Sequence, residues 1–272
     1  GLLIFPAFLI ARNVLGRNAA KIVSVLVAFN PFIIENSLYT WTKNLAAFFI
    51  ITSIYFLFIR KNEKINYIVA GIFFSLAFLS HSYSIFFILT ALIVLIYQRR
   101  FLRRETGYFL IFLIVFSLPY FIWNYASYGT ISSSKFVYYP FVNSYDDAFN
   151  KSPKEILSEF SSTSISKIIE PRLVNVLLTL TPAVALIPIF SDLGLISVTE
   201  NTYKWSYLNH FYHTYFGALT VLLYVAAMIW FFGFLFRKYR IKHDKILFLF
   251  ILIPFIFTLI MWGWYEQGLV MQ

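Results

Sequence analysis

Two ionisable side chains, Lys43 and His81, stand beside apolar runs that are too short to cross a bilayer with ease. Lys43 precedes the run 45–59, and His81 lies with Tyr83 in the segment LSHSYS. An ionisable group at membrane depth is costly and is therefore a candidate for function. The competing interpretations are that Lys43 snorkels to an interface and that His81 is a hydrogen-bonded turn residue. Further candidates for substrate contact precede Lys43 in the sequence: Glu35, Tyr39 and Trp41.

Four other residues could bind a substrate or a metal ion. Arg172 is an external cation in the topology predicted below, and Glu266 follows two tryptophans and could contact a substrate. His210 and His213 are spaced i, i+3, so their imidazoles share one face of a helix. Two ligands do not make a metal site, and a belt of His and aromatic residues at the interface is the favoured interpretation. The sequence thus leaves a divalent metal open and indicates no other cofactor.

The elements that carry these residues must lie mostly in lipid. Of the 272 residues, 60% are hydrophobic and only 12% are charged, with a mean hydropathy of +0.75, whereas soluble domains carry about 25% charged residues. There are no cysteines, which excludes disulfides and thiolate chemistry. We predict an all-α, polytopic membrane helix bundle of about eight apolar segments. The segments are 1–11, 20–38, 45–59, 66–80, 83–97, 107–124, 215–236 and 246–264.

Basic residues are concentrated in four short segments between the apolar runs, which hold 15 of the 22 Lys and Arg residues. These segments are RNVLGRNAAK, RKNEK, QRRFLRRE and RKYRIKHDK. Alternate crossings place all four on one side, as the positive-inside rule requires of cytoplasmic loops. We therefore expect a multi-pass protein of a bacterial or archaeal plasma membrane with cytoplasmic basic loops, and no nucleic-acid partner.

The same alternation makes residues 129–214 a long extracytoplasmic loop between membrane helices at 1–128 and 215–272. Ser152-Pro-Lys-Glu155 has the form of a capping box with proline at the first helical position. The apolar spacing after it predicts one amphipathic helix that ends before Pro171, lying on the membrane or packed on the protein. The stretch 173–191 is almost long enough to span, but Pro182 and Pro188 and the charge pattern favour an interfacial or re-entrant segment.

Residues 66–97 are predicted to form a hairpin of two short helices, because a single crossing would put the flanking basic loops on opposite sides. Each arm of about 15 residues extends roughly 22 Å, less than a hydrocarbon core of about 30 Å. The turn around His81 should therefore lie below the outer surface, covered by protein or lining a wet cavity.

Residues 12–128 resemble the integral-membrane GT-C glycosyltransferases, nearest to the protein O-mannosyltransferase and lipid A aminoarabinose transferase group. The shared features are a proline in the third helix (Pro31), the external segment Tyr39-Thr-Trp-Thr-Lys43-Asn-Leu45, and the helix end Leu76-Ala-Phe-Leu-Ser-His81. The resemblance implies transfer of a sugar from a polyprenyl-phosphate carrier to a hydroxyl of a protein, lipid or glycan at the extracytoplasmic face.

The resemblance also implies a general base in an external loop that would precede Gly1, so the chain is interpreted as a fragment that is inactive alone. Lys43 and Arg172 would stabilise the phosphate leaving group, with His81 as a further donor. Trp41 and Tyr83 could flank the sugar or the isoprenoid. The alternatives are a polytopic transporter or lipid flippase, which would carry ionisable groups near the midplane, and an O-antigen polymerase or ligase.

Overall fold

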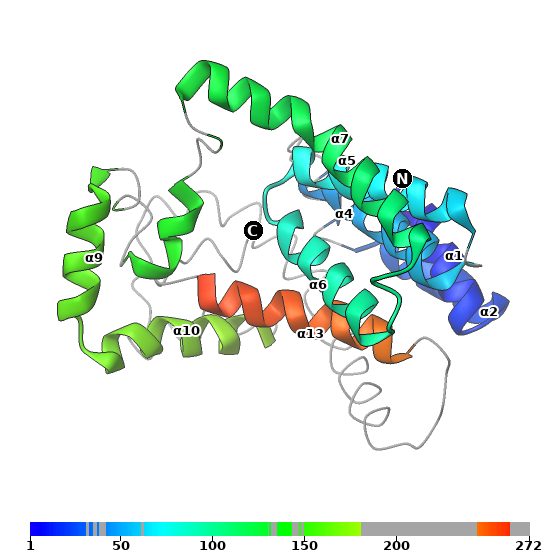
Figure 1. Ribbon diagram of the computed structural model, residues 1–272. Helices are drawn as coiled ribbons and strands as arrows, with labels where there is room; N and C mark the ends of the chain where they lie inside the picture. Colours follow the sequence, from blue (N-terminus) through cyan, green and yellow to red (C-terminus); the bar gives the residue numbers. More distant parts are fainter. Residues whose placement is uncertain are drawn as a thin grey trace. The chain divides into compact units, whose positions relative to one another are not determined.

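The computed structural model describes residues 1–30, 33–34, 37, 42–60, 63–129, 131, 135–142, 147, 150–180 and 244–261. All regular structure in these ranges is helical (Figure 1), and no strand occurs among them, in agreement with the predicted all-α class. The chain divides into two compact units. Unit 1 comprises Gly1–Ser133 and Arg240–Phe257, and unit 2 comprises Ser134–Tyr239 and Thr258–Gln272.

Unit 1 begins with a pair of helices, α1 (Ile4–Val14) and α2 (Arg17–Ala28). Gly16 joins them with φ +94°, a left-handed conformation that costs glycine little. The apolar run 20–38 was expected to be helical over much of its length. Helix α2 ends at Ala28, ahead of Asn30, whose side-chain oxygen accepts a hydrogen bond from the Ile33 amide at 3.3 Å. Residues 33–34 and 37 are again helical.

The next three helices are α4 (Lys43–Ile54), α5 (Lys64–Ser80) and α6 (Ser84–Tyr97). Helix α4 continues into a π-helical turn, η1 (Tyr55–Ile59). Only residues 81–83 separate α5 from α6, so the prediction of a helical hairpin over 66–97 is confirmed.

Helix α7 (Arg104–Tyr128), with 25 residues, is the longest helix among the described residues. Within the described ranges it is also the one helix that is long and apolar enough to cross a bilayer, by length and composition. Five shorter apolar helices accompany it: Ile4–Val14, Lys43–Ile59, Lys64–Ser80, Ser84–Tyr97 and Ile246–Phe257. The eight-segment membrane topology stays a prediction.

The core of unit 1 is built around α5, which packs along α7 (Figure 1). Ser75 Oγ lies 2.5 Å from Ser117 Oγ and donates to the Leu113 carbonyl oxygen at 2.7 Å. Higher residue numbers on α5 meet higher numbers on α7, so the two helices run parallel. Helix α13 (Asp244–Met261) adds Phe250 against Phe58 and Phe257 against Phe86, with ring centroids 5.4 and 5.2 Å apart.

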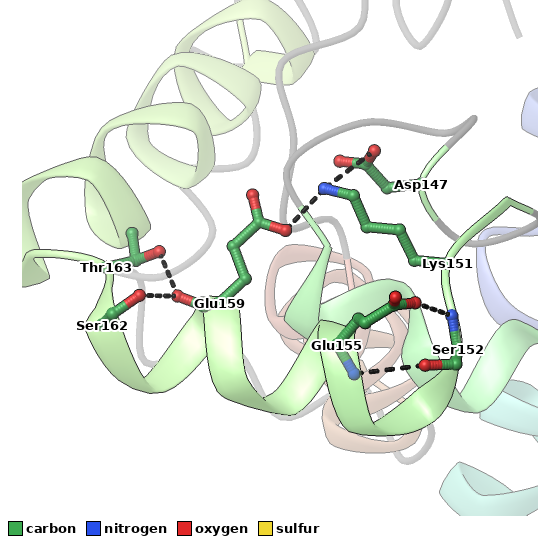
Figure 2. A network of polar contacts seen from close by, with 7 residues as sticks. All are labelled: Asp147, Lys151, Ser152, Glu155, Glu159, Ser162 and Thr163. Carbon is green, nitrogen blue, oxygen red and sulfur yellow. Dashed lines mark hydrogen bonds and ion pairs between the residues drawn. The ribbon is translucent and has the colours of Figure 1, made fainter.

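Unit 2 contains η2 (Lys135–Phe141), α9 (Pro153–Ser162) and α10 (Ile165–Leu180). The predicted capping box is confirmed, because Ser152 Oγ accepts from the Glu155 amide while the Glu155 carboxylate accepts from the Ser152 amide (Figure 2). Val142 and Ile156 form a small buried cluster.

The single amphipathic helix expected over this region is a wrong prediction, because the chain breaks between α9 and α10. The Ser162 and Thr163 hydroxyls donate to the Glu159 carbonyl oxygen at 2.9 and 2.8 Å (Figure 2). Such side-chain bonds compete with the helical backbone. Pro171, the expected end of the helix, instead lies inside α10.

Candidate functional site

His81 occupies the turn between α5 and α6, where it ends α5 in an extended conformation. The Tyr83 backbone amide donates to His81 Nδ1 at 3.3 Å, and the two rings lie 5.4 Å apart. Because Nδ1 accepts a hydrogen bond, it carries no proton in this arrangement. The neutral imidazole therefore keeps its hydrogen on Nε2, where it can be donated to a ligand.

Contacts made by the neighbouring residues Ser84 and Tyr83 stabilise the turn around His81. Ser84 Oγ donates to the Ala77 carbonyl oxygen at 2.9 Å, and the Tyr83 ring packs on Phe86 at 5.7 Å. Ser84 is buried, His81 is half-buried and Ser82 is exposed. These contacts within the protein set the orientation of the half-buried imidazole.

Lys43 is the first residue of α4 and is half-buried. Burial lowers the pKa of His81, and the positive charge of Lys43 lowers it further. The structure therefore brings these two predicted site residues within electrostatic reach of each other. A cation at a helix N-terminus is also unfavourable with respect to the helix dipole. The positive charge of Lys43 and the positive end of the helix dipole both favour an anion at this end of α4.

The segment before α4 is tied to it by Asn44. The Asn44 side-chain amide donates to the Ile33 carbonyl oxygen at 2.7 Å and to Ser37 Oγ at 2.8 Å. This fixes the start of α4 and, with it, the backbone that carries Lys43.

Asn124 on α7 is a candidate that the sequence analysis missed. It is fully buried, and neither Oδ1 nor Nδ2 has a hydrogen-bond partner. One turn earlier Phe121 stacks on Phe78 at 5.8 Å, and Phe78 precedes His81 by three residues. The parallel register of α5 and α7 thus puts Asn124 level with the His81 turn. A lone amide in an apolar helix is the signal that could have identified it.

Arg172 belongs to unit 2 and is considered there by itself. Its guanidinium donates to the carbonyl oxygens of Ile168 and, at 2.7 Å, of Pro140, so it joins α10 to η2. Burial lowers the pKa of Arg172, but a guanidinium remains charged at physiological pH. Carbonyl oxygens do not neutralise the charge, so the remaining N–H groups can still bind an anion.

The other predicted site residues lie outside the described residues. They are Glu35, Tyr39, Trp41, Glu266, His210 and His213. In the part of the chain that the structure describes, no three His, Asp or Glu side chains are grouped as a metal ion would require.

These features define a helical protein with a polar turn between two short helices and, among the described residues, one helix long and apolar enough to cross a bilayer. Residues 1–123 match the model of the family described as dolichyl-phosphate-mannose-protein mannosyltransferase. The match confirms the resemblance to GT-C glycosyltransferases, and it covers the helices from α1 through most of α7, with both Lys43 and His81. Comparisons with curated proteins and with solved structures found no significant match.

Proposed function

We propose that the chain is part of a membrane glycosyltransferase that transfers a sugar from a polyprenyl-phosphate carrier to a hydroxyl acceptor at the extracytoplasmic face. The observation that carries this proposal is the family match over residues 1–123, the segment that also contains Lys43 and His81. A protein acceptor is the first choice, because the description of that family names a protein mannosyltransferase.

The chemistry assigns distinct tasks to Lys43, His81 and Asn124. The bond between the sugar C1 and the phosphate oxygen breaks, the acceptor oxygen bonds to C1, and the acceptor proton passes to a carboxylate base. Negative charge grows on the leaving phosphate, where the Lys43 ammonium stabilises it. His81 donates from Nε2 as a neutral imidazole, because its pKa is lowered. Asn124 offers both a donor and an acceptor to the sugar hydroxyls.

The first test compares Lys43→Ala with Lys43→Arg in the full-length protein reconstituted with polyprenyl-phosphate sugar. Loss of a charged donor to the leaving group should lower kcat/KM by about 100- to 1000-fold, and arginine should restore part of it. Lys21→Ala is the matched control, because Lys21 is an exposed lysine of α2 and should leave kcat/KM unchanged.

Full transfer by correctly inserted Lys43→Ala and Arg172→Ala proteins would contradict the proposal. Movement of the lipid-linked sugar across the bilayer without transfer would support the transporter alternative.

A second test uses the pH dependence of the turn. The folded protein holds the pKa of His81 below the ordinary value of 6.5, so the folded state favours the neutral ring. The contribution of His81 to stability is therefore complete above about pH 6.5 and is lost as the pH falls from there through the folded pKa. His81→Asn replaces the Nδ1 acceptor with an amide oxygen that does not titrate. We expect thermal stability to fall less between pH 7 and pH 5 in His81→Asn than in the wild type, and an equal fall would contradict this prediction.

A further inference from the structure

The end of unit 1 opposite the His81 turn carries five cations close together. Arg99, Arg100, Arg103 and Arg104 connect α6 to α7. Lys64, at the start of α5, lies close to Arg104, because both side chains lie over the Tyr108 ring. The Lys64 Nζ is 4.3 Å and the Arg104 guanidinium 6.0 Å from the centre of that ring. The two salt bridges in the described part of the chain both belong to Lys151 in unit 2. Glu63 and Glu105 are the acidic neighbours of these five cations in the sequence, so the group keeps a net positive charge.

The backbone at Arg99 is unusual for a charged residue. Its φ is +55°, in the left-handed region that favours glycine. The Arg100 amide donates to the Leu95 carbonyl oxygen and the Arg99 amide to that of Ile96, both at 2.9 Å, which is the Schellman pattern of a helix end. Glycine would form this turn without strain. An arginine held in a strained position is a reason to look for a function of its charge.

Tyr67 lies one turn after Lys64 on α5 and is 1% exposed. Its hydroxyl has no hydrogen-bond partner, although buried hydroxyl groups are normally paired. The positive charges of Arg100 and Arg103 act on this hydroxyl, and the negative charge of Glu105 opposes them. Lysine and arginine side chains offer only donors, so they cannot accept the hydroxyl hydrogen. An anion could accept from the tyrosine and the arginines together.

The apolar residues between the arginines indicate where that anion comes from. Leu102 is 96% exposed and Phe101 is also exposed, and Ile96 and Tyr97 extend the same exposed surface. Arginines interleaved with exposed aliphatic and aromatic side chains are typical of segments that lie in the headgroup region of a membrane. A soluble phosphate would not require these apolar side chains.

We propose that Tyr67 and the 99–104 segment bind the phosphate of an anionic phospholipid in the adjoining leaflet. The arginines hold the phosphate, the Tyr67 hydroxyl donates to one of its oxygens, and Phe101 and Leu102 insert beside the acyl chains. The flexible side chains of Arg100 and Arg103 turn toward the lipid to admit it to the hydroxyl. The site is independent of the transferase proposal, because it lies at the other end of α5.

The test uses the purified full-length protein in a neutral detergent, with the unfolding temperature followed as phosphatidylglycerol or phosphatidylcholine is added. Phosphatidylglycerol should raise the unfolding temperature at much lower concentration than phosphatidylcholine. Each arginine near the membrane contributes about fivefold in affinity, so Arg100→Gln/Arg103→Gln should weaken the effect by roughly 25-fold. Tyr67→Phe removes only the hydroxyl and should weaken the affinity for phosphatidylglycerol about tenfold.

Two further variants separate a specific site from general charge and from a structural role. Arg12→Gln/Arg17→Gln removes the same charge from the α1–α2 connection and should leave phosphatidylglycerol affinity unchanged. Arg99→Gly should make the lipid-free protein more stable, because the backbone strain is relieved, and yet bind phosphatidylglycerol more weakly.

Four outcomes would overturn the proposal. One is equal weakening in the Arg12/Arg17 and Arg100/Arg103 variants, which would indicate general charge attraction alone. The second is unchanged affinity in Tyr67→Phe. The third is unchanged affinity in Arg99→Gly, which would make Arg99 structural. The last is an equal rise in unfolding temperature with inorganic phosphate, which would indicate a free-phosphate site.

Discussion

The contact between α5 and α7 and the start of α9 use similar side chains in opposite ways. Along α5 and α7, Ser75 bonds to α7 residues 38 and 42 positions away, in the buried core. At α9, hydrogen bonds and ion pairs join neighbours along a short stretch of exposed chain (Figure 2). The first arrangement depends on the fold of unit 1, and the second forms within one segment.

This difference teaches where a substitution should matter. Packing in the α5–α7 contact has no room to adjust, because backbone atoms of the two helices approach closely at Gly71. The polar network at α9 is open to water, which replaces lost contacts and screens charges. We therefore expect the cost of a change to fall from the buried contact, through the helix cap, to the ion pairs.

Among these substitutions, Gly71→Ala is expected to lower the free energy of unfolding most. A Cβ atom there would lie 2.5 Å from the Phe109 carbonyl oxygen and 3.1 Å from the Leu113 amide nitrogen, both backbone atoms. Overpacking of this kind costs about 1–3 kcal/mol in free energy of unfolding, even though alanine favours the helix. Reversible unfolding of the purified protein in mixed SDS micelles measures the change.

Gly107→Ala is the matched control for Gly71→Ala. A Cβ at Gly107, in the first turn of α7, meets nothing within 4 Å. It should stabilise the protein by about 0.5–1 kcal/mol. An equal change in the free energy of unfolding for the two substitutions would contradict the close approach of α5 and α7 at Gly71.

An intermediate effect is expected for Ser152→Ala. The Ser152 hydroxyl accepts from the Glu155 amide, and N-cap serines contribute about 1 kcal/mol to helix stability. Amide hydrogen exchange in α9 should accelerate about fivefold, as expected for a loss of that size. Ser158→Ala, at an exposed position within α9, is the control and should not accelerate exchange, because alanine favours the helix interior. Unchanged exchange in both variants would contradict the capping role.

The same division between local and remote contacts separates the features of the fold that the sequence predicts from those that it does not. The capping box at Ser152 and the hairpin turn at His81 were predicted correctly, because both depend on residue types and loop charges that can be read from short stretches of sequence. The break after Ser162 was missed, since hydroxyls that bond back to Glu159 give no signal in hydrophobic periodicity. The end of α2 at Ala28 could not be predicted either, because an apolar run shows that residues avoid water but not where a helix ends.

The candidate site divides similarly. Lys43 and His81 were assigned to the same end of the bundle from the alternation of loops, and the structure brings their charges within reach of each other. Their role in binding stays a prediction. Asn124 was missed because its importance depends on which face of α7 meets α5, and the apolar residues around the whole of α7 conceal that face. The pairing of Ser75 with Ser117 was unpredictable for the same reason.

The smallest effect is expected for Lys151→Met. Its ammonium lies 3.1 Å from an Asp147 oxygen and 2.5 Å from a Glu159 oxygen, and these bonds raise the pKa of Lys151 (Figure 2). All three side chains are partly exposed, so water and salt should replace the lost contacts. Hydrogen exchange in α9 should match the wild type at 0.3 M salt and differ slightly, if at all, near 0.01 M, where screening is weak. Acceleration as large as that of Ser152→Ala at high salt would mean that the ion pairs, and not the capping box, hold the start of α9.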